Sequence, residues 1–297
     1  MTVLAVLIGL VTSQMWPIPT LTDKLRSILE KPFIRVREQA GQLLGEKQGY
    51  PWIATLTLPI LLTGAVWLLL RVTTFYFIKF LFMIALSYMI LSLSRTWSRN
   101  TRAFWCLRAH DLEMAVYLLD GSESLSCMEN DALDEQSMIL RSLKQLCGNL
   151  EEDIASPLFF MIFGGLPLMV FVWSIQQVHR LALAAGETDN ALAKPVKLLY
   201  TIITIVPSRL FSLCEVAAAG LMRVRVHAAL RVFGEQWLKQ TSLCASIGEA
   251  SLGLSPISDD GSEALDPEPH DLLRINHLTF FALCVYILML LFLKLVI

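Results

Sequence analysis

The sequence predicts an all-α, polytopic integral membrane protein: a helical bundle with cytoplasmic amphipathic helices. The chain of 297 residues is 55% hydrophobic and only 17% charged, whereas soluble domains have about 25% charged residues. Its mean hydropathy is +0.58. Several apolar runs are long enough to cross a hydrocarbon layer of about 30 Å at about 1.5 Å per helical residue.

These apolar runs predict five membrane spans. The clearest is the 22-residue run Thr73–Ser94, whose only charge, Lys79, is close enough to one end for its stem to reach the interface. The other four are Trp52–Leu70, Ile154–Val178, Val196–Met222 and Leu278–Ile297. A sixth run, Met1 to about Ile18, is marginal, and is either a crossing or a re-entrant helix.

The distribution of Lys and Arg predicts the orientation of the chain. The segment after the first run holds six of them, the segment 95–153 holds six and the segment 223–277 holds five. Cytoplasmic loops collect basic residues, so we expect these three segments in the cytoplasm. Both termini are then outside if the first run crosses, and the N-terminus is inside if it does not.

The chain accordingly divides into five consecutive segments. Residues 1–94 hold the N-terminal membrane helices with a basic cytoplasmic loop, and 95–153 form a cytoplasmic helical segment. Residues 154–222 form a pair of helices, the first of them broken. Residues 223–277 form a cytoplasmic helix and an acidic linker, and 278–297 form a C-terminal membrane anchor.

The cytoplasmic segments carry amphipathic patterns of their own. Asp111 is a predicted N-cap for a short helix. Asp134 precedes a helix with apolar residues at helical spacing, namely Ile139, Leu143, Leu146 and Leu150. Arg223–Leu238 predicts a third helix, and the acidic, proline-containing stretch Ser251–Asp271 predicts a linker.

Composition and motifs exclude several classes of function. A net charge of −2 gives no reason to expect nucleic acid as a partner. The six cysteines are far apart and form no CxxC pair, so we expect them to pack rather than to bind metal or form disulfides. No Walker loop, GxSxG, HExxH or GxGxxG occurs. We therefore predict no metal, no cofactor and no catalytic residues.

The span that begins at Ile154 contains four residues that interrupt helical hydrogen bonding: Pro157, Gly164, Gly165 and Pro167. The following span contains a fifth such residue, Pro207. A break inside the membrane is tolerated only against protein or a water-filled cavity. The first broken span is therefore either the wall of a ligand site or a packing kink that lets helices approach closely.

Arg209 is near the middle of its span, where a guanidinium needs a carboxylate, a phosphate or an aqueous cavity. Glu215 is six residues away and on nearly the opposite helix face, so we expect a partner on another helix. One hypothesis is an anion site formed by Asn149, Glu152 and Arg209 and closed by the helix Asp134–Leu150. The alternative is an internal ion pair that fixes helix register.

Short fragments over roughly residues 100–215 resemble, in order and spacing, the CobD/CbiB family of cobalamin-pathway membrane enzymes and its divergent relatives, the AmpE proteins. These fragments are Arg108-Ala-His-Asp-Leu-Glu-Met-Ala115, Leu133-Asp-Glu135, Asn149, Ser156-Pro-Leu-Phe-Phe160, Gly164-Gly-Leu-Pro167 and Pro207-Ser-Arg-Leu210. The catalytic branch, adenosylcobinamide-phosphate synthase, joins an amino-alcohol phosphate to a corrinoid carboxylate in an ATP-dependent, amide-bond-forming reaction.

The chain departs from the catalytic branch at its polar motifs. Where that branch has a Lys-x-x-Asn-Thr-Leu-Asp-Ser run, this chain has Trp173, Gln176, Gln177, Val178, His179 and Arg180. Where that branch has paired aspartates and an asparagine, this chain has Tyr200, Thr201 and Thr204, and Gly148 replaces its glutamate. A fold retained without its proton-transfer and phosphate-binding groups favours the AmpE side.

The resemblance to AmpE proteins implies a regulatory or sensory protein of the bacterial inner membrane, linked to cell-wall stress signalling, β-lactamase induction and the antibiotic response. Its partners would be the lipid bilayer and an anionic small molecule or a membrane protein. The alternatives are an enzyme of the adenosylcobinamide-phosphate synthase type and a small transporter built around the broken span. The oligomeric state stays open, because small residues serve packing within and between chains alike.

Overall fold

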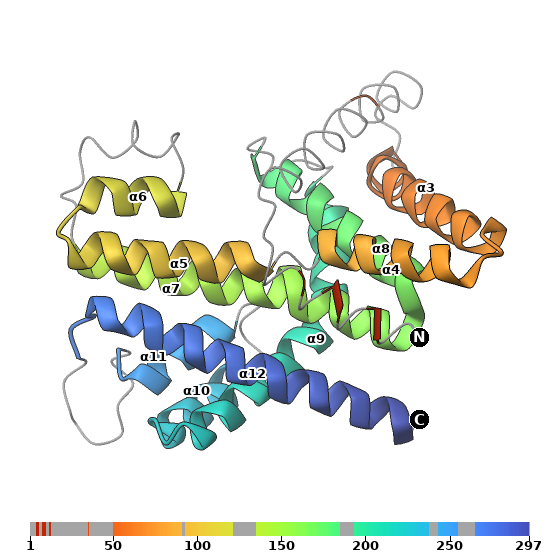
Figure 1. Cartoon of the computed structure of the whole chain (residues 1–297). Coiled ribbons are helices and arrows are strands. Elements are labelled where there is room, and N and C mark those ends of the chain that lie inside the picture. Colours follow the sequence, from red (N-terminus) through yellow and green to blue (C-terminus); the bar gives the residue numbers. More distant parts are fainter. Residues whose placement is uncertain are drawn as a thin grey trace. The chain divides into compact units, whose positions relative to one another are not determined.

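The computed structural model of the chain describes residues 4–5, 8–9, 12, 35, 50–90, 93–120, 135–184, 193–237, 243–254 and 265–296 (Figure 1). Every regular element in these ranges is a helix, which confirms the predicted fold class. The elements are α3 (Tyr50–Val72), α4 (Tyr76–Ile90), α5 (Leu93–Arg108), α6 (Leu112–Asp120), α7 (Glu135–Leu150), the π-helical turn η2 (Glu151–Ala155), α8 (Ser156–Ala184), α9 (Ala193–Leu221), α10 (Val226–Gln236), α11 (Cys244–Leu252) and α12 (Pro269–Val296).

Four helical segments among the described residues are long and apolar enough to cross a membrane. They are Thr55–Val72, the apolar part of Glu135–Arg180, Lys194–Leu221 and Pro269–Val296. Four of the five predicted spans are confirmed in this sense. The chain is therefore a multi-pass membrane protein.

The fifth predicted span, Thr73–Ser94, is not confirmed. Thr73–Phe75 connect α3 to α4, and the described part of α4, Tyr76–Ile90, has 15 residues. This described part covers about 22 Å of the roughly 30 Å of a hydrocarbon layer. The marginal first run, Met1 to about Ile18, lies almost entirely outside the described residues.

The helices divide into two compact units. Unit 1 consists of residues 1–93 and 152–206, and unit 2 of residues 94–151 and 207–297. The predicted segment 154–222 thus contributes to both units. In unit 1, α3 packs along α8, and Leu58, Val178 and Val196 form a buried apolar cluster.

The outer faces of α3 and α4 are apolar. Leu68 is 57% exposed and Phe77 is 72% exposed. Apolar side chains displayed over whole helix faces are unfavourable in water and favourable against lipid chains. This exposure agrees with a membrane environment for unit 1.

The predicted interruption of the first broken span lies at Gly165. Its φ of 75° and ψ of −173° are non-helical, although α8 continues on both sides. Side chains disfavour this conformation, so it is almost exclusive to glycine. Pro167 follows two residues later, and Pro157 is the second residue of α8, directly after the π-helical turn η2. Pro207 lies inside α9, which runs as one helix from Ala193 to Leu221.

In unit 2, α5, α7 and α12 lie side by side (Figure 1). Their shared apolar core includes Phe104, Leu107, Ile139 and Leu272, all 1% exposed or less. A buried amide links the three helices: Asn100 donates to the Leu272 carbonyl at 3.0 Å, and the Ser142 hydroxyl donates to Asn100 Oδ1 at 2.6 Å. A satisfied polar link of this kind fixes one helix register within an apolar core.

The predicted amphipathic helices are present, and the third of them has a changed start. The Asp111 carboxylate accepts a hydrogen bond from the Met114 backbone N–H at 3.0 Å, which confirms it as the N-cap of α6. The four apolar residues predicted for the helix after Asp134 are all buried in α7. The predicted helix from Arg223 begins only at Val226, because Arg223 has a φ of 56° and belongs to a turn.

The predicted linker Ser251–Asp271 is shorter than expected. Ser251 and Leu252 belong to α11, which ends at Gly253 with a left-handed φ of 80°. At the other end α12 starts at Pro269, and the Asp271 carboxylate accepts a hydrogen bond from the Glu268 N–H at 3.0 Å. This is the reciprocal contact of a capping box, and it extends the C-terminal helix beyond the predicted anchor.

Replacing Gly165 with alanine tests whether the break depends on its backbone conformation. A Cβ at Gly165 would meet only Pro167 Cδ, at 3.9 Å, so the cost comes from φ and not from a clash. We expect Gly165→Ala to lower the free energy of unfolding in detergent by about 1–3 kcal/mol.

The matched control is Gly234→Ala in α10, where a Cβ meets nothing within 4 Å. That change should raise the free energy of unfolding by roughly 0.5–1 kcal/mol. Equal effects of the two substitutions would show that Gly165 does not need its left-handed conformation.

Candidate functional site

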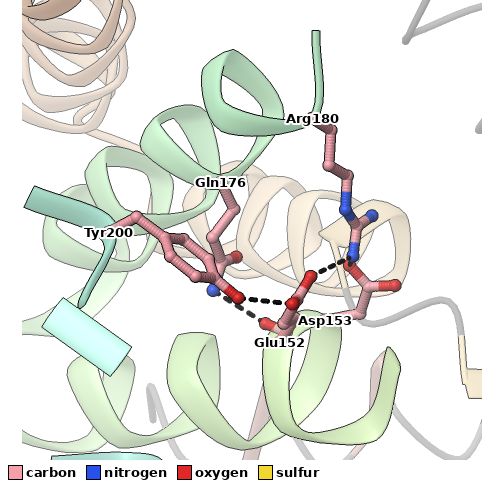
Figure 2. Close-up of polar contacts among 5 residues, drawn as sticks. All are labelled: Glu152, Asp153, Gln176, Arg180 and Tyr200. Carbon is pink, nitrogen blue, oxygen red and sulfur yellow. Dashed lines mark hydrogen bonds and ion pairs between the residues drawn. The ribbon is translucent and has the colours of Figure 1, made fainter. Parts of the chain in front are cut away.

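The first of two polar clusters is in unit 1 and centres on Glu152, a predicted site residue. The Tyr200 hydroxyl donates a hydrogen bond to Glu152 Oε1, and Arg180 Nη2 pairs with Glu152 Oε2 at 3.1 Å. Gln176 Nε2 donates to the Glu152 backbone carbonyl at 2.8 Å. Figure 2 shows the three side chains converging on this one residue from α8 and α9.

Asp153 joins the same cluster through Arg180. The Arg180 guanidinium lies 2.7 Å from Asp153 Oδ1, so one cation bridges two successive carboxylates (Figure 2). The side chains of Glu152, Asp153 and Arg180 are about a quarter to a third exposed, which leaves the cluster partly accessible to solvent or headgroups. The bridge offsets the repulsion between the two anions.

The aromatic ring of Tyr200 also stacks against a histidine ring. His179 stacks on it with ring centroids 4.2 Å apart and planes inclined by 22°. Stacking fixes the ring while its hydroxyl donates to Glu152. The cluster therefore has a fixed tyrosine, a bridging arginine and an amide, all engaged with the π-helical turn at the start of the broken span.

Sequence reasoning identified Glu152 but not its partners. Gln176 and Arg180 are four residues apart and so share one face of a helix, a signal that could have grouped them. Tyr200 is on a different helix, and no local pattern connects it to Glu152.

The second cluster is in unit 2 and centres on Glu151, which is 4% exposed. Its Oε1 accepts hydrogen bonds from the Ser208 hydroxyl at 3.0 Å, the Ser212 hydroxyl at 3.3 Å and the Cys244 backbone N–H at 3.1 Å. The two serines are one turn apart on α9. The third donor belongs to the first turn of α11, where the helix dipole favours an anion.

Arg209, the predicted intramembrane arginine, is 8% exposed and belongs to unit 2. Its guanidinium carbon lies 5.7 Å from the centre of the Trp237 ring, a cation–π distance. The Glu151 carboxylate also attracts it electrostatically. Both partners come from outside α9, as expected from the unfavourable spacing to Glu215.

The three predicted anion-site residues do not belong to one unit. Glu152 is in unit 1, whereas Arg209 is in unit 2, as is Asn149, which is half-buried near the end of α7. Glu152 is engaged by Arg180 and Tyr200, and Arg209 by Trp237 and Glu151. The described contacts favour the alternative reading, in which the charged groups are compensated inside the chain.

Unit 2 also holds a group of side chains that could ligate a metal. Cys147, Glu215 and Cys244 each offer a donor atom, and the three atoms lie within 4.8 Å of one another. All three residues are buried. No sequence pattern indicates this grouping, because the residues come from α7, α9 and α11 and have no metal-ligand spacing.

The surroundings of Cys244 keep its thiol protonated. Burial, and then the neighbouring Cys147, Glu215 and Glu151, raise the pKa of the Cys244 thiol well above its ordinary value. A protonated thiol is a poor nucleophile. This cysteine is therefore unsuited to covalent catalysis in the absence of a cation.

The chain matches no protein-family model, no curated protein and no solved structure. The geometry of the two clusters is accordingly the structural ground for a functional proposal.

Removing the bridging arginine tests whether the Glu152 cluster is structural. Arg180→Gln leaves Glu152 and Asp153 adjacent without their cation, and we expect a loss of about 1–2 kcal/mol in the free energy of unfolding. Chemical unfolding in detergent, followed by circular dichroism, measures this loss.

Arg231→Gln in α10 is the control. It breaks an exposed Arg231–Glu235 pair one turn apart, and should change the free energy by no more than about 0.5 kcal/mol. An unchanged stability of Arg180→Gln would mean that the Glu152 cluster does not hold unit 1 together.

Proposed function

We propose that this protein is a non-catalytic regulatory or sensory component of the bacterial inner membrane, of the AmpE type. Its role would be in cell-wall stress signalling and β-lactamase induction. The observation that carries the proposal is the pairing of Glu152 with Gln176, Arg180 and Tyr200. These partners stand where the resembled enzyme has its polar motifs.

The chemistry of this cluster supports a structural role over a catalytic one. A general base needs a carboxylate that is free to take a proton from substrate, and a phosphate site needs cations that are free to bind it. In this cluster the Glu152 carboxylate is occupied by Tyr200 and Arg180, and Arg180 is occupied by two carboxylates. The groups neutralise one another.

A partner for such a protein would be an anionic small molecule or another membrane protein. Arg209 is the residue of interest for an anion, because it is cationic and lies in a candidate span. Its contact with Trp237 and its attraction to Glu151 give it a defined position without a ligand. A signalling anion would then have to compete with an internal carboxylate.

Deleting the gene tests the regulatory role. In a host with an inducible β-lactamase, the deletion should alter induction by a cell-wall-active drug, and the wild-type gene should restore it. Enzyme activity is measured with a chromogenic β-lactam before and after exposure to the drug. Unchanged induction in the deletion strain would contradict the proposal.

An enzyme assay tests the alternative, amide-bond formation of the adenosylcobinamide-phosphate synthase type. We expect purified protein to form no product from a corrinoid acid, aminopropanol phosphate and ATP, because the matched polar positions are engaged with one another. Turnover that is lost in Glu152→Gln would show that the cluster is catalytic, and would replace the regulatory proposal.

A further inference from the structure

The buried group of Cys147, Glu215 and Cys244 is independent of the Glu152 cluster and of the proposed function. Cys147 comes from α7, Glu215 from α9 and Cys244 from the first turn of α11. Cys147, Glu215 and Cys244 are each 0% exposed. Two thiols and a carboxylate thus meet inside unit 2, away from water.

Glu215 is the member of this group that most needs a partner. Neither of its carboxylate oxygens accepts a hydrogen bond of ordinary geometry from the described residues, although the Cys244 thiol is near enough to act as a weak donor. A buried carboxylate whose donor is a single weak thiol is costly. A bound cation would remove that cost.

The spacing of the donor atoms suits a small thiophilic cation. Two sulfurs and one oxygen lie within 4.8 Å of one another. Ligands of a tetrahedral zinc ion, bound at about 2.0–2.3 Å, are roughly 3.5–3.8 Å apart, so a contraction of at most about 1 Å would give the three atoms the spacing of three of the four zinc ligands. Gly248 borders the group: a Cβ there would be in ordinary contact with Glu215 Oε1 at 3.4 Å and Cys147 Sγ at 3.5 Å, and would clash with Ile275 Cδ1 at 2.8 Å.

We propose that Cys147, Cys244 and Glu215 bind a thiophilic divalent cation, of which Zn²⁺ is the representative. Two thiolates and a carboxylate are a ligand set that zinc accepts and that magnesium and calcium do not favour. The site is structural: it joins α7, α9 and α11. Its complete burial leaves no access for a substrate.

Charge balance supports a cation at this position. Glu151 adds a fourth acidic group, which acts electrostatically on Cys147, Cys244 and Glu215. Binding a divalent cation displaces the two thiol protons and any proton on Glu215, so metal binding should release protons and weaken as pH falls.

The experiment uses the full-length protein, because a buried site must be filled while the chain folds. Protein is expressed with Zn²⁺ in the medium, purified in detergent without chelator, and analysed for metal by mass spectrometry. We expect about one zinc ion per chain. Expression with Co²⁺ in place of zinc should give the sulfur-to-cobalt charge-transfer absorption of a thiolate site.

Variants assign the metal to these residues. Cys147→Ser and Cys244→Ser should lose the metal and the charge-transfer absorption. Glu215→Gln, whose side chain has nearly the same shape as glutamate, should lower the metal affinity by on the order of ten-fold or more. Cys106→Ser and Cys284→Ser are the matched controls, because these cysteines lie outside the group and should retain the metal.

Three results would overturn the proposal. Wild-type protein with less than about a tenth of an equivalent of any transition metal would exclude a native site. Metal that persists in Cys147→Ser and Glu215→Gln would place the ion elsewhere. A disulfide between Cys147 and Cys244, found after alkylation without reductant, would show that the two sulfurs bind each other. The wild-type measurements decide the matter even if a variant fails to fold.

Discussion

A carboxylate inside an apolar helical bundle must be met by donors from the same chain, and this constraint governs the centre of the protein. Water and lipid chains cannot compensate a charge at such a position, and an unpaired one costs several kcal/mol. The π-helical turn η2 places Glu151 and Glu152 in succession. Successive residues of a helix point in different directions, so the two carboxylates have two separate sets of partners. Glu151 is 4% exposed, whereas the Glu152 side chain is 32% exposed.

Each carboxylate has such a set. Glu151 is met by the Ser208 and Ser212 hydroxyls and by the first-turn N–H of α11. Glu152 is met by Tyr200 and Arg180. The first set holds α9 and α11 to η2 within unit 2, and the second holds α8 and α9 to η2 within unit 1. The polar contacts of Glu151 and Glu152 thus join helices to one another.

The features that local patterns encode could be predicted. Hydropathy predicted the spans of α3, α8, α9 and α12, because length and apolarity are properties of a single segment. The glycine pair in the broken span predicted the interruption at Gly165, and the cap at Asp111 followed from its position before an amphipathic run. The predicted Thr73–Ser94 crossing is not confirmed: Thr73–Phe75 form a connection, so that α4 starts only at Tyr76.

Features that depend on long-range contacts could not be predicted. Glu152 was recognised as a polar group in a membrane segment, but Tyr200 is 48 residues away. Cys147 and Cys244 carry no spacing signal, and they meet only because α7 and α11 pack together. The predicted trio of Asn149, Glu152 and Arg209 joined residues by polarity alone, and it stays a prediction. Glu152 contacts Tyr200 and Arg180, and Arg209 lies against Trp237.

The most direct test of this account is amide hydrogen exchange at Cys244. The first-turn N–H groups of a helix have no partner within that helix and normally exchange fast. Because Glu151 accepts this one, the Cys244 amide should exchange slowly in the wild-type protein, and faster by on the order of ten-fold or more in Glu151→Ala. Fast exchange at Cys244 in the wild type, or equal rates in both proteins, would contradict the claim that the buried carboxylate of Glu151 holds α11 in place.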